Sequence, residues 1–110
     1  MHPEGTHFAV GNRGHDSVAI FAVRQTGAME LVGITPSGGA CPRNFNWTCG
    51  GKYLVVGNQN SSTVCVFAFD RTSGALTPAH ETAGVTSPNF VFPIPCSELE
   101  GLFTVDAPAA

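Results

Sequence analysis

The hydrophobic positions of this chain form two unbroken runs, each following a similar set of turn residues. The runs are VAIFAV at 18–23 and VCVFAF at 64–69. Because a strand made only of apolar residues must be covered on both faces, each run predicts a strand enclosed between two layers. Glycine, proline and asparagine separate these runs from other short apolar segments. The pattern therefore predicts an all-β chain with frequent turns.

Residues 42–48 show a different pattern, because apolar and polar side chains alternate. Phe45 and Trp47 fall on one face of the expected strand, and Asn44 and Asn46 fall on the other. Such alternation predicts one packed face and one wet face, as beside a water-filled channel. We expect the two aromatic residues to pack between sheets, with contact to a sugar as the alternative.

The sequence also repeats itself. GNRGHDSVAIF at 11–21 returns 46 residues later as GNQNSSTVCVF, and the segment PRN at 42–44 returns with the same offset as PNF at 88–90. A repeat of this length built only from strands predicts stacked sheets and, with them, part of a β-propeller. The expected strands are 7–12, 17–23, 29–35 and 42–48 in the first repeat, and 53–58, 63–69, 76–82 and 88–94 in the second.

These strands predict about two four-stranded antiparallel blades in an incomplete ring. The partial propeller is expected over residues 1–95, with the first repeat at about 5–48 and the second at about 51–94. Residues 96–110 end in Ala-Pro-Ala-Ala and match neither repeat, so we expect a disordered tail there. Exposed blade faces would need cover, from copies of the same chain or from the missing blades of a longer one.

Composition and charge narrow the function. Charged residues make up only 12% of the 110 residues, and the net charge is −3. No block of basic residues occurs in the sequence, which disfavours nucleic acid as a partner. No apolar run approaches the ~20 residues of a membrane helix, and no secretory signal is visible, so a cytoplasmic protein is expected. The four cysteines form no Cys-x-x-Cys pair. Reduced thiols are therefore favoured over a disulfide or zinc site, and no metal or cofactor is expected.

The chain direction predicts where a functional site would lie. If each blade zigzags outward from its innermost strand, the turn after its second strand and the connection into the next blade's first strand reach the same rim. The segments on this rim are 12–16, 38–43, 58–62 and 87–89. They carry most of the reactive side chains, whereas the opposite rim receives turns rich in glycine, serine and threonine. A site built on loops at one rim is the expectation.

Several of these segments together resemble the lactonase family of β-propellers, which includes propeller-type 6-phosphogluconolactonases. They are NRGHDS at 12–17, PRNF at 42–45, GNQNS at 57–61, TSGALTP at 72–78 and HPEG at 2–5. The resemblance implies a seven-bladed propeller, of which this chain would be the C-terminal portion. It also implies hydrolysis of a phosphorylated sugar lactone in the pentose phosphate pathway.

Opening a lactone with water requires a base, positive charge for the developing oxyanion, and an anchor for the anionic group of the substrate. The resemblance assigns the catalytic part to His15, Arg13 and Arg43. Histidine titrates near neutral pH, and arginine binds phosphate or carboxylate bidentately. The residues expected to bind substrate are Asp16, Asn44, Gln59 and Asn60.

Each of these residues also has a structural interpretation. His15 is equally suited to bonding a neighbouring carbonyl in its turn, and Asp16 is typical of a turn-stabilising side chain. Arg43 is suited to an ion pair between blades, and Gln59 and Asn60 to holding the second copy of the turn. The repeats keep their glycines and apolar residues while the reactive side chains differ, which favours a site added to a repeated framework.

Other functions remain open at this stage. A muconate-type lactonising cyclase would use the same arginine and histidine residues on a dicarboxylate. A chain of two blades is also consistent with a catalytically inactive fragment or an interaction module. A scaffold propeller for protein partners is weaker, because the chain has a single tryptophan and no Trp-Asp signature.

Overall fold

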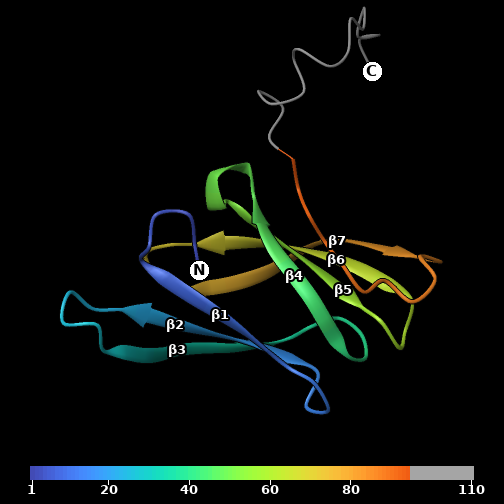
Figure 1. Cartoon of the computed structure of the whole chain (residues 1–110), viewed down its shortest axis with the longest axis horizontal. Coiled ribbons are helices and arrows are strands. Elements are labelled where there is room, and N and C mark those ends of the chain that lie inside the picture. Colours follow the sequence, from blue (N-terminus) through green and yellow to red (C-terminus); the bar gives the residue numbers. More distant parts are fainter. Residues whose placement is uncertain (95–110) are drawn as a thin grey trace, which may run out of the picture.

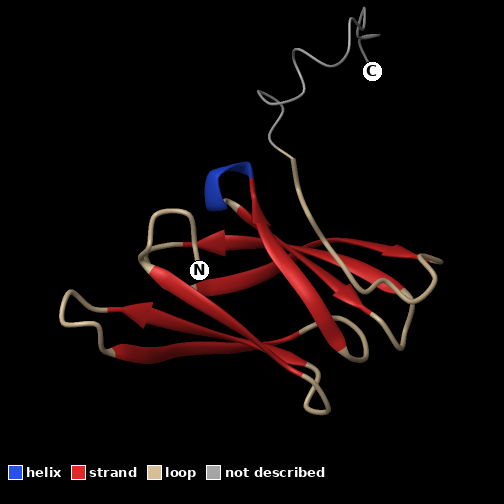
Figure 2. Ribbon diagram, viewed as in Figure 1, coloured by secondary structure: helices blue, strands red, loops and turns tan. Residues whose placement is uncertain are grey.

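The computed structural model describes residues 1–94, which form two antiparallel sheets (Figures 1 and 2). The first sheet has the order β1-β2-β3, and the second has the order β4-β5-β6-β7. The strands are β1 (His7–Asn12), β2 (Ser17–Val23), β3 (Met29–Pro36), β4 (Pro42–Thr48), β5 (Tyr53–Asn58), β6 (Thr63–Asp70) and β7 (Ala75–Ala83). A short 3₁₀ turn, Cys49–Gly51, joins β4 to β5. The prediction of an all-β, partial propeller is confirmed.

Strand β4 belongs to the second sheet, so its expected place as the fourth strand of the first sheet is wrong. It pairs antiparallel with β5, with Phe45 opposite Val56 and Trp47 opposite Leu54. The connection from β3 turns at Gly38, where φ is 82°, and leaves the edge of β3 instead of folding back along it. The sheets therefore have three and four strands, with β4 at one edge of the second.

Residues 88–94 do not form the expected strand. Their backbone is held by side chains of β4: the Val91 N–H donates to Asn44 Oδ1 at 2.7 Å, and Asn46 Nδ2 donates to the Val91 carbonyl at 3.4 Å. No strand of the described residues pairs with this segment, so a ladder cannot form. The predicted disordered tail at 96–110 lies outside the described residues.

The core lies between the two sheets. Val18 and Ile20 of β2 are 1% exposed and cluster with Leu54, Val56 and Phe67 of the second sheet. On both β2 and β6, residues of the far face are in part only half-buried. We predicted that these strands are covered on both faces. One face is fully covered, and the other is covered in part, because the described residues supply a facing sheet on one side only.

Candidate functional site

The predicted rim segments meet at one end of the strands, to the lower right in Figure 1. The Ser37 N–H donates to the Asp16 carbonyl at 2.9 Å, which ties the connection into β4 to the turn after β1. The Gln59 N–H donates to the Cys41 carbonyl at 2.9 Å, which ties the same connection to the turn after β5. The prediction that these segments share a rim is confirmed.

Two arginines on this rim contact neutral acceptors. Arg13 Nη2 donates to the Arg43 carbonyl at 3.3 Å, and Arg43 Nη1 donates to Gln59 Oε1 at 3.4 Å. Both side chains are exposed, and neither forms an ion pair with another residue in 1–94. The expected alternative, an ion pair of Arg43 between blades, is therefore not seen. The rim presents two guanidinium groups whose charge is available to an anion.

Asp16 holds the shape of the turn. Its φ of 57° lies in the left-handed region, and its Oδ1 accepts N–H groups from Gly14 at 3.3 Å and Cys41 at 2.9 Å. A carboxylate satisfied by backbone amides fits the structural interpretation of this residue. Its carboxylate also adds negative charge close to the turn that carries Arg13, so the part it plays toward an anionic substrate stays a prediction.

His15 is exposed, and a buried serine orients its ring. His15 Nδ1 lies 2.7 Å from Ser17 Oγ, and Asn12 Nδ2 donates to the same oxygen at 3.2 Å. Ser17 is 2% exposed, which fixes the position of its hydroxyl group. When Nδ1 donates its proton to Ser17, the lone pair of Nε2 is free to accept a proton from water. Sequence reasoning did not identify the supporting pair Asn12 and Ser17.

The other predicted binding residues have different surroundings. Asn44 uses its Oδ1 to bind the backbone of Val91, so part of its bonding capacity is already taken. Gln59 accepts the bond from Arg43, which places it beside the arginine pair. Asn60 is exposed, and its backbone N–H donates to the Ala40 carbonyl at 3.0 Å. The structure therefore brings Gln59 to the arginines and assigns Asn44 largely to the framework.

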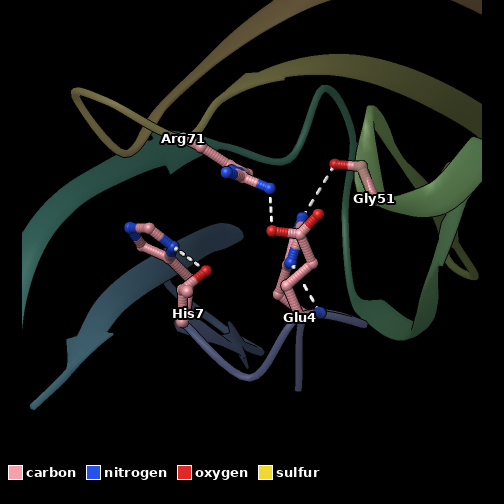
Figure 3. A network of polar contacts seen from close by, with 6 residues as sticks. Glu4, His7, Gly51 and Arg71 are labelled. Atoms are coloured by element: carbon pink, nitrogen blue, oxygen red, sulfur yellow. Dashed lines mark hydrogen bonds and ion pairs between the residues drawn. The ribbon is translucent and has the colours of Figure 1, made fainter. Parts of the chain in front are cut away.

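The opposite end of the molecule contains a network of polar contacts that includes Glu4, Gly51 and Arg71 (Figure 3), and with it a buried histidine that the sequence did not reveal. His2 is 1% exposed; its Nε2 lies 3.1 Å from the Gly51 carbonyl, and its Nδ1 accepts the Glu4 N–H at 3.2 Å. Its ring packs against Trp47, with the two centroids 4.9 Å apart. Gly5 and Gly51, which flank this contact and lie 46 residues apart, both have positive φ.

His7 lies beside this buried group. Its Nδ1 is 2.9 Å from Thr6 Oγ1, and its ring is 5.0 Å from that of Phe69. Burial lowers the pKa of His7 below 6.5, and the positive charges of His2 and Arg24 lower it further. The neutral imidazole is therefore favoured in the folded chain. This end of the molecule joins the N-terminal segment to the second sheet, and Glu4 and Arg71 add an ion pair across it.

Two grooves on the described residues are lined by neither Arg13 nor Arg43. One, of about 390 Å³, runs between β3 and the outer part of the second sheet and is lined by residues including Gly38, Cys65 and His80. Burial and the charge of Glu81 raise the pKa of Cys65, which keeps its thiol protonated. The other groove, of about 440 Å³, lies at the His2 end. No cluster of metal ligands occurs within residues 1–94, and no helix there is long and apolar enough to cross a membrane.

Solved structures share this fold. A candidate 6-phosphogluconolactonase from Bacteroides fragilis is 33% identical with a TM-score of 0.76, over 82% of this chain and 26% of that one. The periplasmic gluconolactonase PpgL from Pseudomonas aeruginosa is 35% identical with a TM-score of 0.72, over 77% of this chain and 24% of that one. The expected placement of this chain in the C-terminal portion of a propeller is not supported by these matches.

Bacterial proteins are also similar to this chain in sequence. An uncharacterized protein of Staphylococcus aureus (strain USA300) is 45% identical over 75 residues, which is 66% of this chain and 22% of that protein. The chain thus spans about a fifth of the length of the relatives it matches. The family model described as "Lactonase, 7-bladed beta-propeller" matches residues 1–93. The chain belongs to the lactonase family of seven-bladed β-propellers.

Proposed function

We propose that the arginine rim of this chain takes part in the hydrolysis of a sugar lactone that carries an anionic group. The observation that supports this most strongly is that Arg13 Nη2 contacts the Arg43 carbonyl while neither arginine forms an ion pair within the described residues. An anionic group of the substrate would bind there bidentately. A phosphorylated sugar lactone of the pentose phosphate pathway in the cytoplasm is the specific substrate proposed.

The reaction would use His15 as the base. Its Nε2 takes a proton from water while the water oxygen attacks the lactone carbonyl, and the carbonyl oxygen becomes an oxyanion. A guanidinium group stabilises this oxyanion. The bond between the carbonyl carbon and the ring oxygen then breaks, and His15 returns its proton to the ring oxygen. The product is an open hydroxy acid, and the atoms balance with water as the only co-reactant.

Because the chain spans about a quarter of the solved propellers, the activity of a whole propeller is also part of this proposal. Further blades would supply the remaining walls of a site at the channel. Arg13 and Arg43 are both exposed, and neither of the two grooves described above is lined by them. Binding of an anionic sugar acid is therefore the minimum function expected of the isolated chain.

Kinetics and binding test the proposal together. Acid release measures the hydrolysis of 6-phosphogluconolactone and of gluconolactone. NMR titration measures the binding of 6-phosphogluconate. Arg43→Ala is expected to lower kcat/KM, or binding in an inactive chain, by about tenfold or more, as loss of a charged hydrogen-bond partner should. The matched control is Arg24→Ala at the other end of the strands. Unchanged behaviour of Arg43→Ala removes Arg43 from the site, and a chain that neither binds nor hydrolyses contradicts the proposal.

A further inference from the structure

Strand β4 is irregular at Arg43. The register between β4 and β5 shifts between Pro42 and Asn44, so Arg43 has no partner on β5. A bulge of this kind takes one residue out of the ladder and redirects its side chain, and bulges are common beside functional sites. The carbonyl and the guanidinium group of Arg43 accordingly make contacts outside the ladder.

The turns after β1 and β5 both hold this bulged residue. Arg13 lies in the first turn and Gln59 in the second, 46 residues apart, so they occupy the same place in the repeat. Arg13 Nη2 donates to the Arg43 carbonyl at 3.3 Å, and Arg43 Nη1 donates to Gln59 Oε1 at 3.4 Å. The backbone of Arg43 is therefore held from the first sheet, and its guanidinium group is held from a turn of the second sheet.

The backbone around Gln59 is anchored to the connection that carries Arg43. The Gln59 N–H donates to the Cys41 carbonyl at 2.9 Å, and the Asn60 N–H donates to the Ala40 carbonyl at 3.0 Å. Gln59 is also half-buried, whereas Arg43 is exposed. A partly enclosed side chain on an anchored backbone restrains a longer, exposed side chain. The position of the guanidinium group thus depends on Gln59.

The neighbours of Gln59 determine which way its amide faces. Its Oε1 lies 3.4 Å from Arg43 Nη1 and 4.0 Å from Cys41 Sγ. A guanidinium group can only donate hydrogen bonds and a thiol can donate one, so the amide oxygen must face them. Gln59 Nε2 makes no hydrogen bond to another residue in 1–94. Its two N–H groups therefore remain available to a ligand.

The neutrality of this partner distinguishes Arg43 from other arginines of the chain. Two of the four arginines form ion pairs: Arg24 with Glu30, and Arg71 with Glu4. Arg43 instead contacts the amide oxygen of Gln59. A carboxylate at this place would pair with the guanidinium group and take up its charge. A neutral acceptor orients the guanidinium group and leaves its charge for a ligand.

We propose that Gln59 is the positioning residue of the anion site on this rim. It orients the guanidinium group of Arg43 and keeps its charge free, so it acts mainly through Arg43. The proposal rests on the proposed function of the rim. It also defines the class of ligand group, because Arg13, Arg43 and Gln59 Nε2 are all donors. Such a site favours an ionised oxyanion, as in a phosphate or carboxylate.

NMR titration with 6-phosphogluconate tests the charge of the site. Gln59→Glu is expected to weaken binding by about tenfold or more, because the new carboxylate pairs with Arg43 and repels the ligand. Gln59→Ala loses only a neutral contact and should weaken binding by about threefold. The matched control is Gln25→Glu, which makes the same change at the chain's other glutamine, exposed in the turn after β2. This control should bind like the wild type.

A double-mutant cycle tests whether Gln59 acts through Arg43. In an Arg43→Ala background, Gln59→Glu is expected to lose most of its effect on binding, because the guanidinium group that it would pair with is gone. A loss as large as in the wild-type background would show that Gln59 acts on the ligand directly. That result would overturn the positioning role.

The order of the Arg43 side chain gives a readout that needs no ligand. The heteronuclear NOE of the Arg43 Nε–H is expected to fall in Gln59→Ala, and to be retained in Gln59→Glu, where an ion pair replaces the hydrogen bond. Order retained while binding is lost separates the charge of Gln59 from its effect on structure. Circular dichroism checks the fold of each variant, since the backbone contacts of Gln59 are kept in all of them.

These measurements separate failure of this proposal from failure of the proposed function. A wild-type chain that does not bind 6-phosphogluconate contradicts the proposed function, and the NOE of Arg43 then still decides whether Gln59 positions it. An Arg43 side chain equally ordered in Gln59→Ala overturns the positioning role, whether or not the chain binds. A Gln59→Glu variant that binds as tightly as the wild type overturns the part assigned to charge.

Discussion

The turn after β1 and the turn after β5 share one backbone and differ in chemistry. Asp16 and Ser62 have φ values of 57° and 54°, and each side chain accepts an N–H from the following connection. The first turn adds the exposed groups Arg13 and His15, where the second has glutamine and serine. The frame therefore does not depend on the reactive residues. This separation is what a site carried on a repeated scaffold requires.

The connection between β3 and β4, which contains Gly38, and the segment after β7, which contains Gly84 at the equivalent place 46 residues later, differ in what surrounds them. A side chain at Gly38 would lie 2.5 Å from Cys65 Sγ, whereas one at Gly84 would meet nothing within 4 Å. A side chain at Gly39 would clash with Ser61 Oγ. The equivalent residue after β7 is Val85, which is 38% exposed. The second sheet thus crowds the first connection, while the second connection lies open on the corresponding side. The same backbone therefore has different tolerance to substitution in the two repeats.

The largest difference in unfolding free energy between equivalent positions of the two repeats is expected in the core. Phe67 is 2% exposed and belongs to the core cluster, whereas its equivalent Phe21 is half-buried on the far face of β2. Phe67→Ala is expected to lower the free energy of unfolding by about 3–5 kcal/mol. Phe21→Ala should cost no more than about 2 kcal/mol. Urea unfolding followed by the fluorescence of Trp47 measures both. Equal losses would show that the two faces are equally enclosed.

Substitution at the two connection glycines gives a smaller difference. Gly84→Ala is expected to cost about 1–2 kcal/mol, which is the penalty of positive φ alone. Gly38→Ala adds the contact with Cys65 and should cost about 2–4 kcal/mol. Cys65→Ala supplies the control, because removing the sulfur should return the cost of Gly38→Ala toward that of Gly84→Ala. If the cost persists without the sulfur, crowding at Cys65 is not its cause.

The acceptors in the two turns differ in charge. Asp16→Ala removes a charged acceptor of two N–H groups and is expected to cost about 1.5–3 kcal/mol. Ser62→Ala removes a neutral acceptor and should cost about 0.5–1.5 kcal/mol. Asp16→Asn retains an acceptor oxygen and should fall between them. Chemical denaturation of all three variants ranks the losses, and a Ser62→Ala loss above that of Asp16→Ala would reverse this assignment.

Strand positions could be predicted because turn residues and apolar runs are local signals. The run at 18–23 and its repeat both became strands, and the rim segments met as the chain direction required. Strand pairing could not be predicted in the same way. Residues 42–48 are compatible with the edge of β3 and with the edge of β5, and Gly38 decides between them through its backbone geometry. Residues 88–94 alternate like a strand but have no neighbouring strand among residues 1–94, and the sequence does not show this.

The residue types of the candidate site could be predicted from local sequence, but their contacts could not. Sequence patterns identified Arg13, Arg43 and His15 as residue types suited to the chemistry. The contacts of Gln59 with Arg43 and of Ser17 with His15 depend on how the turns meet, so they became visible only in three dimensions. His2 was missed because its burial depends on Gly51, which lies 49 residues away along the chain. Long-range packing of this kind leaves no local pattern.

The smallest expected effect concerns the first residues of β1 and β5. His7 is buried, whereas its equivalent Tyr53 is 37% exposed. Because the pKa of His7 is lowered in the folded chain, the unfolded chain binds a proton more readily between that pKa and 6.5. The resulting stability is fully present above pH 6.5 and decreases as the pH falls through this window. His7→Gln should flatten this part of the pH dependence, measured by urea unfolding, while His80→Gln at an exposed position should retain it. An unchanged slope in His7→Gln would assign the pH dependence to another group.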